Sequence, residues 1–340
     1  MNKELAVEKR RKNILLETPE LKKLDICKTS YPYPKDIKKY WKEKPIEYSK
    51  DLFPLFRSIY IETTSWCNFS CSFCPSSYLK REKVDMDNSL FEKIILELKQ
   101  MDYTGKIQLY QSNEPLTDLN LEKKVKFVKD QKMKAQIGIV SNALLLKKER
   151  LYNLIEAGID FIIAEIYTSD SYYNKVKELF VEATNDFQET KNVQVFEDDF
   201  KFYDLSGGTK INKRNKVTLV LYKRYKEFGD NNINLTTRLG AISDDNFIKT
   251  KNYQHSMCVR PFREFQVTYT GKVLLCCEEW LFEKDSIVGD LNKNTISEIW
   301  NGKPLMDYRR KLQKKDRGFS PCDKCEYRGG GNQNQIRYVK

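Results

Sequence analysis

Several features that would place a chain in a membrane or outside the cell are missing from this sequence. No stretch approaches the roughly 18–20 apolar residues that a membrane-spanning helix needs. Residues 1–12 are charged and no apolar run follows them, so a secretory signal peptide is not predicted. We therefore expect a soluble, cytoplasmic protein. In that reducing compartment its 9 cysteines should be metal ligands, a catalytic set or buried thiols, and not disulfides.

Histidine is almost absent, because His255 is the only one in 340 residues. It lies three residues before Cys258, and we expect a surface or packing role for it. Any site that needs several soft metal ligands must therefore take them from cysteine.

The charge and the apolar content together describe a folded, basic protein. Hydrophobic residues make up 40% and aromatic residues 12% of the chain, which is enough for a core. The formal net charge is +12, but Lys and Glu alternate and no basic stripe interleaved with aromatics is present. We therefore do not expect nucleic-acid binding, and the charge remains compatible with a phosphate- or nucleotide-linked substrate.

From Ser58 onward the pattern alternates between short β-branched runs and amphipathic segments, which predicts βα units around a parallel sheet. Asn88 is the expected N-cap of the first helix and Gly158 the expected end of the third. Residues 187–215 are polar and are predicted to be an insertion or an extended loop. Strands are expected at 58–63, 106–110, 135–140, 160–164 and 217–222, and helices at 89–101, 119–130, 147–157 and 171–185.

The C-terminal third differs in composition and in its predicted elements. Residues 230–256 are Asn-rich, and the residues on either side of Gly271 predict a β-hairpin over 265–276. Helices are expected at 295–300 and 304–312. The division that we predict is an N-terminal extension (1–56), a core domain (57–229), a crossing (230–257) and a C-terminal domain (258–340). Cys27 in the extension is expected to be a spare thiol.

Three cysteines directly follow the first predicted strand. Cys67, Cys71 and Cys74, the first cysteine group, have the spacing C-x3-C-x2-C. Thiolates are soft ligands that suit zinc or iron–sulfur clusters. A zinc site would need a fourth ligand, and none lies nearby. Three ligands on a four-iron cluster leave one iron open to bind a reactant.

With Phe73 before the third cysteine, this loop resembles the signature of the radical SAM superfamily. The resemblance implies a partial (β/α)6 TIM-type barrel in an α/β fold. It also implies a 4Fe–4S cluster whose open iron binds S-adenosyl-L-methionine (SAM) and generates a 5′-deoxyadenosyl radical. Phe73 would then pack near the adenine. Asn113-Glu114-Pro115 is similar to the end of the family's Gly-Gly-Glu-Pro motif, with Ser112-Asn113 in place of the glycines. Ser141-Asn142 resembles its Thr-Asn-Gly loop, and both motifs would contact SAM.

A second cysteine group comprises Cys258, Cys276, Cys322 and Cys325. Four thiolates fit a closed 4Fe–4S cluster or a structural zinc, and chemistry alone does not choose between them. The spacing resembles the SPASM or shorter twitch extension of radical SAM enzymes. This implies a small α+β iron–sulfur domain with one auxiliary 4Fe–4S cluster. Cys277 is expected to be a spare thiol.

The resemblance implies an oxidoreductase-type enzyme that abstracts a hydrogen atom from its substrate. We expect it to oxidise or epimerise a small carbohydrate-like molecule, because no peptide-binding winged-helix element is recognisable near the N-terminus. A flavodoxin or ferredoxin would supply electrons. The alternatives are a maturase of a ribosomally made peptide and a non-enzymatic, zinc-stabilised binding protein. No catalytic acid or base can be nominated from the sequence.

Overall fold

The computed structural model describes residues 46–48, 55–71, 74–197, 216–223, 238–242, 253, 255–281, 284–327 and 336–338. Cys27, Phe73, most of the extension and most of the predicted crossing therefore lie outside the described residues. Within the described part of the chain, no helix has both the length and the apolar character needed to cross a membrane.

The centre of the molecule is one nine-stranded sheet with the strand order β10-β9-β8-β2-β3-β4-β5-β7-β6. All strands from β8 to β6 pair in parallel, whereas β8, β9 and β10 are antiparallel. The strands are β2 (Ser58–Ile61), β3 (Lys106–Gln108), β4 (Gln136–Ser141), β5 (Phe161–Ile166), β6 (Val193–Glu197), β7 (Val217–Lys223), β8 (Glu264–Val267), β9 (Lys272–Leu274) and β10 (Ile287–Asp290).

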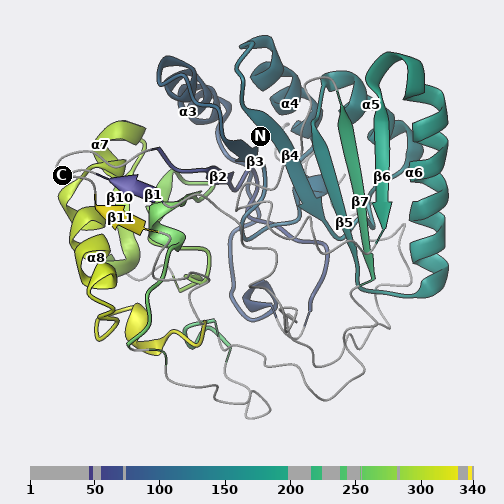
Figure 1. Cartoon of the computed structure of the whole chain (residues 1–340). Coiled ribbons are helices and arrows are strands. Elements are labelled where there is room, and N and C mark those ends of the chain that lie inside the picture. Colours follow the sequence, from purple (N-terminus) through teal and green to yellow (C-terminus); the bar gives the residue numbers. More distant parts are fainter. Residues whose placement is uncertain are drawn as a thin grey trace, which may run out of the picture.

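Four helices cover one face of the parallel part of the sheet, along the outer side of the molecule in Figure 1. The strand residues on this face are apolar, and Ile59, Ile107 and Ile139 are completely buried in the core that the helices share. The opposite face of the sheet carries polar and aromatic residues. The strand register places Tyr60 there, beside Gln108 and Gln266. The helices are α3 (Asn88–Gln100), α4 (Leu121–Asp130), α5 (Lys148–Ala157) and α6 (Asp170–Lys191).

Strand–helix alternation on a parallel sheet is the α/β architecture that the sequence predicts. Gly158 ends α5 with a φ of 95°, as expected of a left-handed C-cap.

Two predictions about these elements were wrong. The N-cap of α3 is Asp87, whose carboxylate accepts from the backbone N–H groups of Ser89 and Leu90, and not Asn88. The predicted loop at 187–215 contains the end of α6 and strand β6, because Val193 and Val195 alternate with polar residues beside β7.

The predicted C-terminal hairpin is present, with Gly271 at its turn with a φ of 82°. Its first strand, β8, also pairs with β2, so the chain beyond residue 258 shares the sheet of the preceding part. The helices α7 (Ile296–Trp300) and α8 (Lys303–Gln313) lie at the far end from α6 (Figure 1). Phe265 and Trp300 both contact Phe56, with ring centroids 4.9 and 5.1 Å away. The division into domains therefore stays a prediction.

The remaining elements are short. Strand β1 (Ile46–Tyr48) pairs in parallel with β11 (Ile336–Tyr338), which brings segments from the two ends of the chain together. The 3-10 helices are η2 (Pro75–Ser77), η3 (Pro115–Thr117), η6 (Arg260–Phe262), η7 (Lys284–Ser286) and η8 (Cys322–Lys324).

Candidate functional site

The predicted site segments follow the carboxyl ends of neighbouring parallel strands. The first cysteine group comes after β2, the segment 111–116 after β3, and Asn142 directly after β4. Carboxyl ends of parallel strands meet at one edge of a sheet, where barrel folds build their sites from loops. The strand order β2-β3-β4 makes these three loops direct neighbours.

The thiols of the first cysteine group act on one another, with Cys71 buried and Cys67 and Cys74 half-buried. Burial raises the pKa of Cys67, and the nearby Glu114, Cys74 and Cys71 raise it further. Burial and Cys74 likewise raise the pKa of Cys71. Cys67 Sγ accepts the Phe69 N–H at 3.4 Å, and all three cysteines are free of disulfides. Such thiols become thiolates only beside a positive charge, and an iron–sulfur cluster supplies one. This donor set therefore fits a cluster.

A buried ion pair holds the loop that follows the first cysteine group. Arg81 binds Glu62 through two hydrogen bonds of 2.7 Å, and Glu62 is completely buried. Arg81 also donates to the carbonyl of Ser112 at 3.2 Å. Glu62 accepts the N–H of Tyr269 at 3.1 Å. This pair thus connects the cysteine loop to the ends of β2 and β3 and to the turn after β8.

Glu114 connects the ends of β3 and β4. Its carboxylate accepts from Ser141 Oγ at 2.6 Å, from the Asn142 N–H at 2.8 Å and from the Leu116 N–H at 3.0 Å. Burial raises the pKa of Glu114 to about 7, although those hydrogen bonds and Arg150 oppose the shift. The Asn142 side chain in turn donates to Asn68 Oδ1 at 2.8 Å, which adds the loop after β2 to the same network.

Four buried polar atoms at this edge have no hydrogen-bond partner. They are Asn68 Nδ2, Gln111 Nε2, Asn113 Nδ2 and Thr168 Oγ1. Buried polar groups are nearly always paired, so unpaired ones mark a place where a ligand or water completes the bonding. Three of the four are amide N–H donors, which suit the carboxylate and hydroxyl groups of a ligand such as SAM. The residues present therefore fit that cofactor.

The thiols of the second cysteine group also act on one another, with Cys258 buried and the other three half-buried. Burial raises the pKa of Cys276, and Cys325, Cys322 and Cys258 add to the shift. Burial raises the pKa of Cys325 to about 12 and that of Cys322 above its usual value. As in the first group, such a set fits a positively charged partner that converts the thiols to thiolates.

A single metal ion would need these ligands to meet more closely. Among the described residues, no three Cys, His, Asp or Glu side chains gather tightly enough for one ion. Thiolates on one zinc lie within about 4 Å of one another, because each Zn–S bond is about 2.3 Å. Thiolates that each bind a different iron of a cluster need not meet so closely.

One charged pair acts electrostatically on thiols of both cysteine groups. Arg238 donates to Glu278 at 2.5 Å, and Glu278 is only 4% exposed. Cys74 of the first group raises the pKa of Arg238 together with Glu278, against the effect of burial. Glu278 in turn raises the pKa of Cys325 in the second group. The pair is therefore within electrostatic reach of both groups.

Sequence reasoning did not identify Arg238 or Glu278. Arg238 lies in the irregular stretch that was predicted as a crossing, where no pattern marks a side chain for function. Glu278 is two residues after Cys276, and this proximity to a candidate ligand was the one available signal. Only the fold brings the two side chains together.

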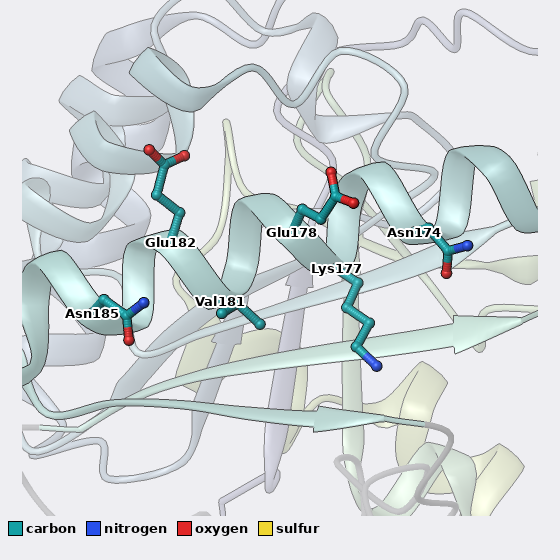
Figure 2. Close-up of a pocket in the computed structure, with 6 residues that line it drawn as sticks. All are labelled: Asn174, Lys177, Glu178, Val181, Glu182 and Asn185. Carbon is teal, nitrogen blue, oxygen red and sulfur yellow. The ribbon is translucent and has the colours of Figure 1, made fainter.

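An open pocket of about 520 Å³ lies along α6, and Figure 2 labels its lining residues. The residues that line it all belong to this helix, and they are Asn174, Lys177, Glu178, Val181, Glu182 and Asn185. None of them follows a strand end or is a cysteine. The pocket is therefore no part of the candidate site.

Two family models match the chain. Residues 61–193 match the model described as the radical SAM superfamily. Residues 258–326 match the SPASM iron–sulfur cluster-binding domain. The first match contains the first cysteine group and the Glu114 network, and the second contains all four cysteines of the second group.

Among curated proteins, the chain is 26% identical over 288 residues to the S-adenosyl-L-methionine-dependent 2-deoxy-scyllo-inosamine dehydrogenase of Niallia circulans, covering 84% of this chain and 98% of that protein. It is 25% identical over 260 residues to the tungsten-containing aldehyde ferredoxin oxidoreductase cofactor-modifying protein of Pyrococcus furiosus, covering 74% and 70%.

Among solved structures, the chain resembles BtrN in complex with AdoMet and 2-DOIA. The TM-score is 0.58 and the identity 25%, with 80% of this chain and 93% of that chain covered. An open conformation of BtrN gives a TM-score of 0.53 at 21% identity, covering 81% and 94%. The fold is therefore that of radical SAM enzymes, a partial barrel followed by a smaller C-terminal part.

Proposed function

The chain belongs to the radical SAM superfamily and carries a C-terminal SPASM domain, and on that premise we propose that it oxidises one alcohol of a small, polar, carbohydrate-like substrate to a ketone. The observation that carries the proposal is the Arg238–Glu278 pair, whose Glu278 is buried and whose charges act on thiols of both cysteine groups. A pair in this position can hold a polar substrate between one site that starts a radical reaction and another that takes up an electron.

The cysteines have separate tasks in this proposal. Cys67, Cys71 and Cys74 hold the SAM-binding 4Fe–4S cluster, and Cys258, Cys276, Cys322 and Cys325 hold one auxiliary 4Fe–4S cluster. When bound, the first cluster supplies the electron that cleaves SAM to a radical, and the second supplies an acceptor for the electron released by substrate oxidation. A reduced flavodoxin or ferredoxin is the proposed external electron donor.

Residues at the strand ends bind and orient SAM in the proposal. The amide groups of Asn68 and Asn113 face the ligand with unpaired N–H donors. Glu114 acts indirectly, because its hydrogen bonds to Ser141 and Asn142 fix the loop after β4 against the loop after β3. Phe73 is proposed to pack beside the adenine.

The Arg238–Glu278 pair binds the reacting end of the substrate. Burial raises the pKa of Glu278, but Arg238 and Arg260 outweigh it, so that the pKa lies below the usual value. Glu278 is therefore ionised at neutral pH and can accept the hydroxyl proton. With its cofactors bound, the site held by Cys67, Cys71 and Cys74 would supply the acceptor for the carbon-bound hydrogen. The site held by Cys258, Cys276, Cys322 and Cys325 would supply the acceptor for the remaining electron, so that the two-electron oxidation balances.

Two observations support a small polar substrate. The relative from Niallia circulans is a dehydrogenase named for 2-deoxy-scyllo-inosamine and matches over 98% of its length. In addition, the sheet face opposite the helices carries Tyr60, Gln108 and Tyr110. The Tyr60 and Tyr110 rings meet edge to face at 5.6 Å. Such a polar, aromatic surface suits a ring rich in hydroxyl and amino groups.

The test compares three substrates with the anaerobically reconstituted protein. 2-Deoxy-scyllo-inosamine, the same ring without its amino group and a short peptide are each supplied with SAM and reductant. We expect ketone and 5′-deoxyadenosine in equal amounts from a cyclitol substrate. Glu278→Gln and Arg238→Gln should cleave SAM without forming ketone. Turnover of the peptide alone, or full turnover by both variants, would overturn the proposal.

A further inference from the structure

Two arginines act on the second cysteine group, the buried Arg317 and the half-buried Arg260. Arg317 is 1% exposed and donates to three backbone carbonyls, those of Ser256, Met257 and Tyr327, at 2.8, 3.1 and 2.7 Å. Two of these carbonyls directly precede Cys258, and the third follows Cys325 by two residues. Arg317 thus ties together the two separate chain segments that carry three of the four cysteines.

Arg260 contacts the group from another direction. Its guanidinium lies over the Tyr327 ring at 4.1 Å, and it pairs with Glu278 at 3.5 Å. It also donates to Cys277 Sγ. Arg260 follows Cys258 by two residues, so one turn of chain carries both a proposed ligand and a cation.

The charges act on the thiols in opposite directions. Arg260 lowers the pKa of Cys258 and Cys276, and Arg317 lowers that of Cys258, Cys322 and Cys325, each against burial. The acidic groups that face the same thiols raise these pKa values. They are Glu264 for Cys258, Asp323 for Cys322 and Glu278 for Cys325.

We propose that Arg260 sets the reduction potential of the auxiliary site, with Arg317 as the positioning residue that holds the ligand segments together. Uptake of one electron adds one negative charge to a site that already carries four thiolates. A fixed neighbouring cation favours that added charge, and net charge is among the main determinants of cluster potential. Arginine remains protonated throughout, so the electron can enter without uptake of a proton.

This inference deepens the proposed function, because an electron acceptor for substrate oxidation needs a potential high enough to be reduced. Arg260 and its partner Glu278 carry opposite charges, so their removal should shift the reduction potential in opposite directions. Removal of the cation should lower the potential, and removal of the charge on Glu278 should raise it.

The experiment measures the midpoint potential of the auxiliary cluster alone. The triple variant Cys67→Ala, Cys71→Ala, Cys74→Ala is reconstituted anaerobically with iron and sulfide, and its reduced cluster is titrated by electron paramagnetic resonance. We expect Arg260→Gln on this background to shift the midpoint to a lower potential at about four irons per chain. Arg260→Lys should shift it less, and Glu278→Gln should shift it upward.

The controls separate charge from structure. Arg310→Gln removes an exposed arginine of α8 that pairs with Asp307, and it should leave the potential unchanged. Arg317→Gln should lower the iron content, since it releases the two ligand segments. Unchanged potentials in both Arg260→Gln and Glu278→Gln, with iron retained, would overturn the inference. Because the titration contains no substrate, a failed substrate assignment would leave these shifts intact.

Discussion

At the scale of single residues, the site contains polar groups whose burial lowers the stability of the folded protein. Cys67 in the first cysteine group and Cys276 in the second have raised pKa values, and the amide N–H donors of Asn68 and Asn113 stay unpaired. Glu114 belongs to the same class, because burial raises its pKa to about 7. A protein maintains such groups where a bound partner completes them, which is typical of functional sites.

Glu114 gives a pH dependence with a definite sign. Its usual pKa is 4.5, so between about pH 4.5 and 7 the folded protein keeps a proton that the unfolded chain loses. The stability contributed by this group is therefore complete below pH 4.5 and falls as the pH rises to 7. We expect wild-type protein to lose about 3 kcal/mol relative to Glu114→Gln over that window.

Thermal unfolding of both proteins at pH 5 and pH 8 measures this difference. Glu114→Gln replaces one acceptor oxygen by an N–H donor that faces the Asn142 N–H, so it should be less stable at pH 5. The gap between the two proteins should narrow at pH 8. An equal gap at both pH values would show that Glu114 is ionised in the folded protein at all pH values tested.

The residues that could be predicted are those whose spacing carries meaning along the chain. Both cysteine groups were predicted in this way, the first from its short C-x3-C-x2-C spacing and the second from the likeness of its spacing to a SPASM or twitch extension. Arg238 and Arg260 could not be found so, since their partners Glu278 and Tyr327 are distant in sequence. Their roles depend on charge neighbours that only the fold assembles.

At the scale of elements, the loops after the strands depend on a few buried anchors. Arg81–Glu62 is one of these anchors, and both side chains are at most 10% exposed. Arg81→Gln leaves the Glu62 carboxylate buried without its cation. We expect this to cost about 3–5 kcal/mol and to reduce iron loading at the first cysteine group.

Lys126→Gln is the matched control for Arg81→Gln. It breaks an ion pair with Asp130 in which both side chains are more than half exposed, at 60% and 54%. Exposed pairs contribute about 0–1 kcal/mol, so stability and iron content should hardly change. Thermal unfolding and iron analysis measure both effects. Equal effects of the two substitutions would contradict the proposal that the buried Arg81–Glu62 pair stabilises the cysteine loop.

Most helices and strands followed from periodicity, and the two wrong predictions have physical causes. Asp87 and Asn88 both suit an N-cap, and the structure selects Asp87 by its bonds to Ser89 and Leu90. Strand β6 was missed because its exposed, polar surroundings are typical of a loop. Its pairing with β7, which is distant in sequence, decides its structure.

At the scale of the whole molecule, the sheet runs through the predicted boundary between core and C-terminal domain. Strand β8 pairs with β2 along its whole length, and Phe56 stacks on Phe265. A chain that ends at residue 229 would expose the edge of β2 and the apolar surface around Phe56. We expect this truncated chain to aggregate and to unfold without a cooperative transition.

Size-exclusion chromatography and circular dichroism of the truncated chain test this expectation. A monomeric, cooperatively melting fragment would establish that residues 57–229 fold as an independent domain. The sequence could not show whether residues 57–229 fold alone. Strand β8, which pairs with β2, comes from beyond residue 229, and nothing in residues 57–229 indicates that pairing.

The most direct test of the account is the yield of 5′-deoxyadenosine and of oxidised product from reduced, reconstituted protein with SAM and substrate. Wild-type protein should hold about eight irons per chain and form both products. Cys71→Ala should form neither, whereas Cys322→Ala should still cleave SAM but form no oxidised product. Tight zinc binding without SAM cleavage, or identical loss in two folded variants, would contradict the division into a SAM-cleaving and an auxiliary site.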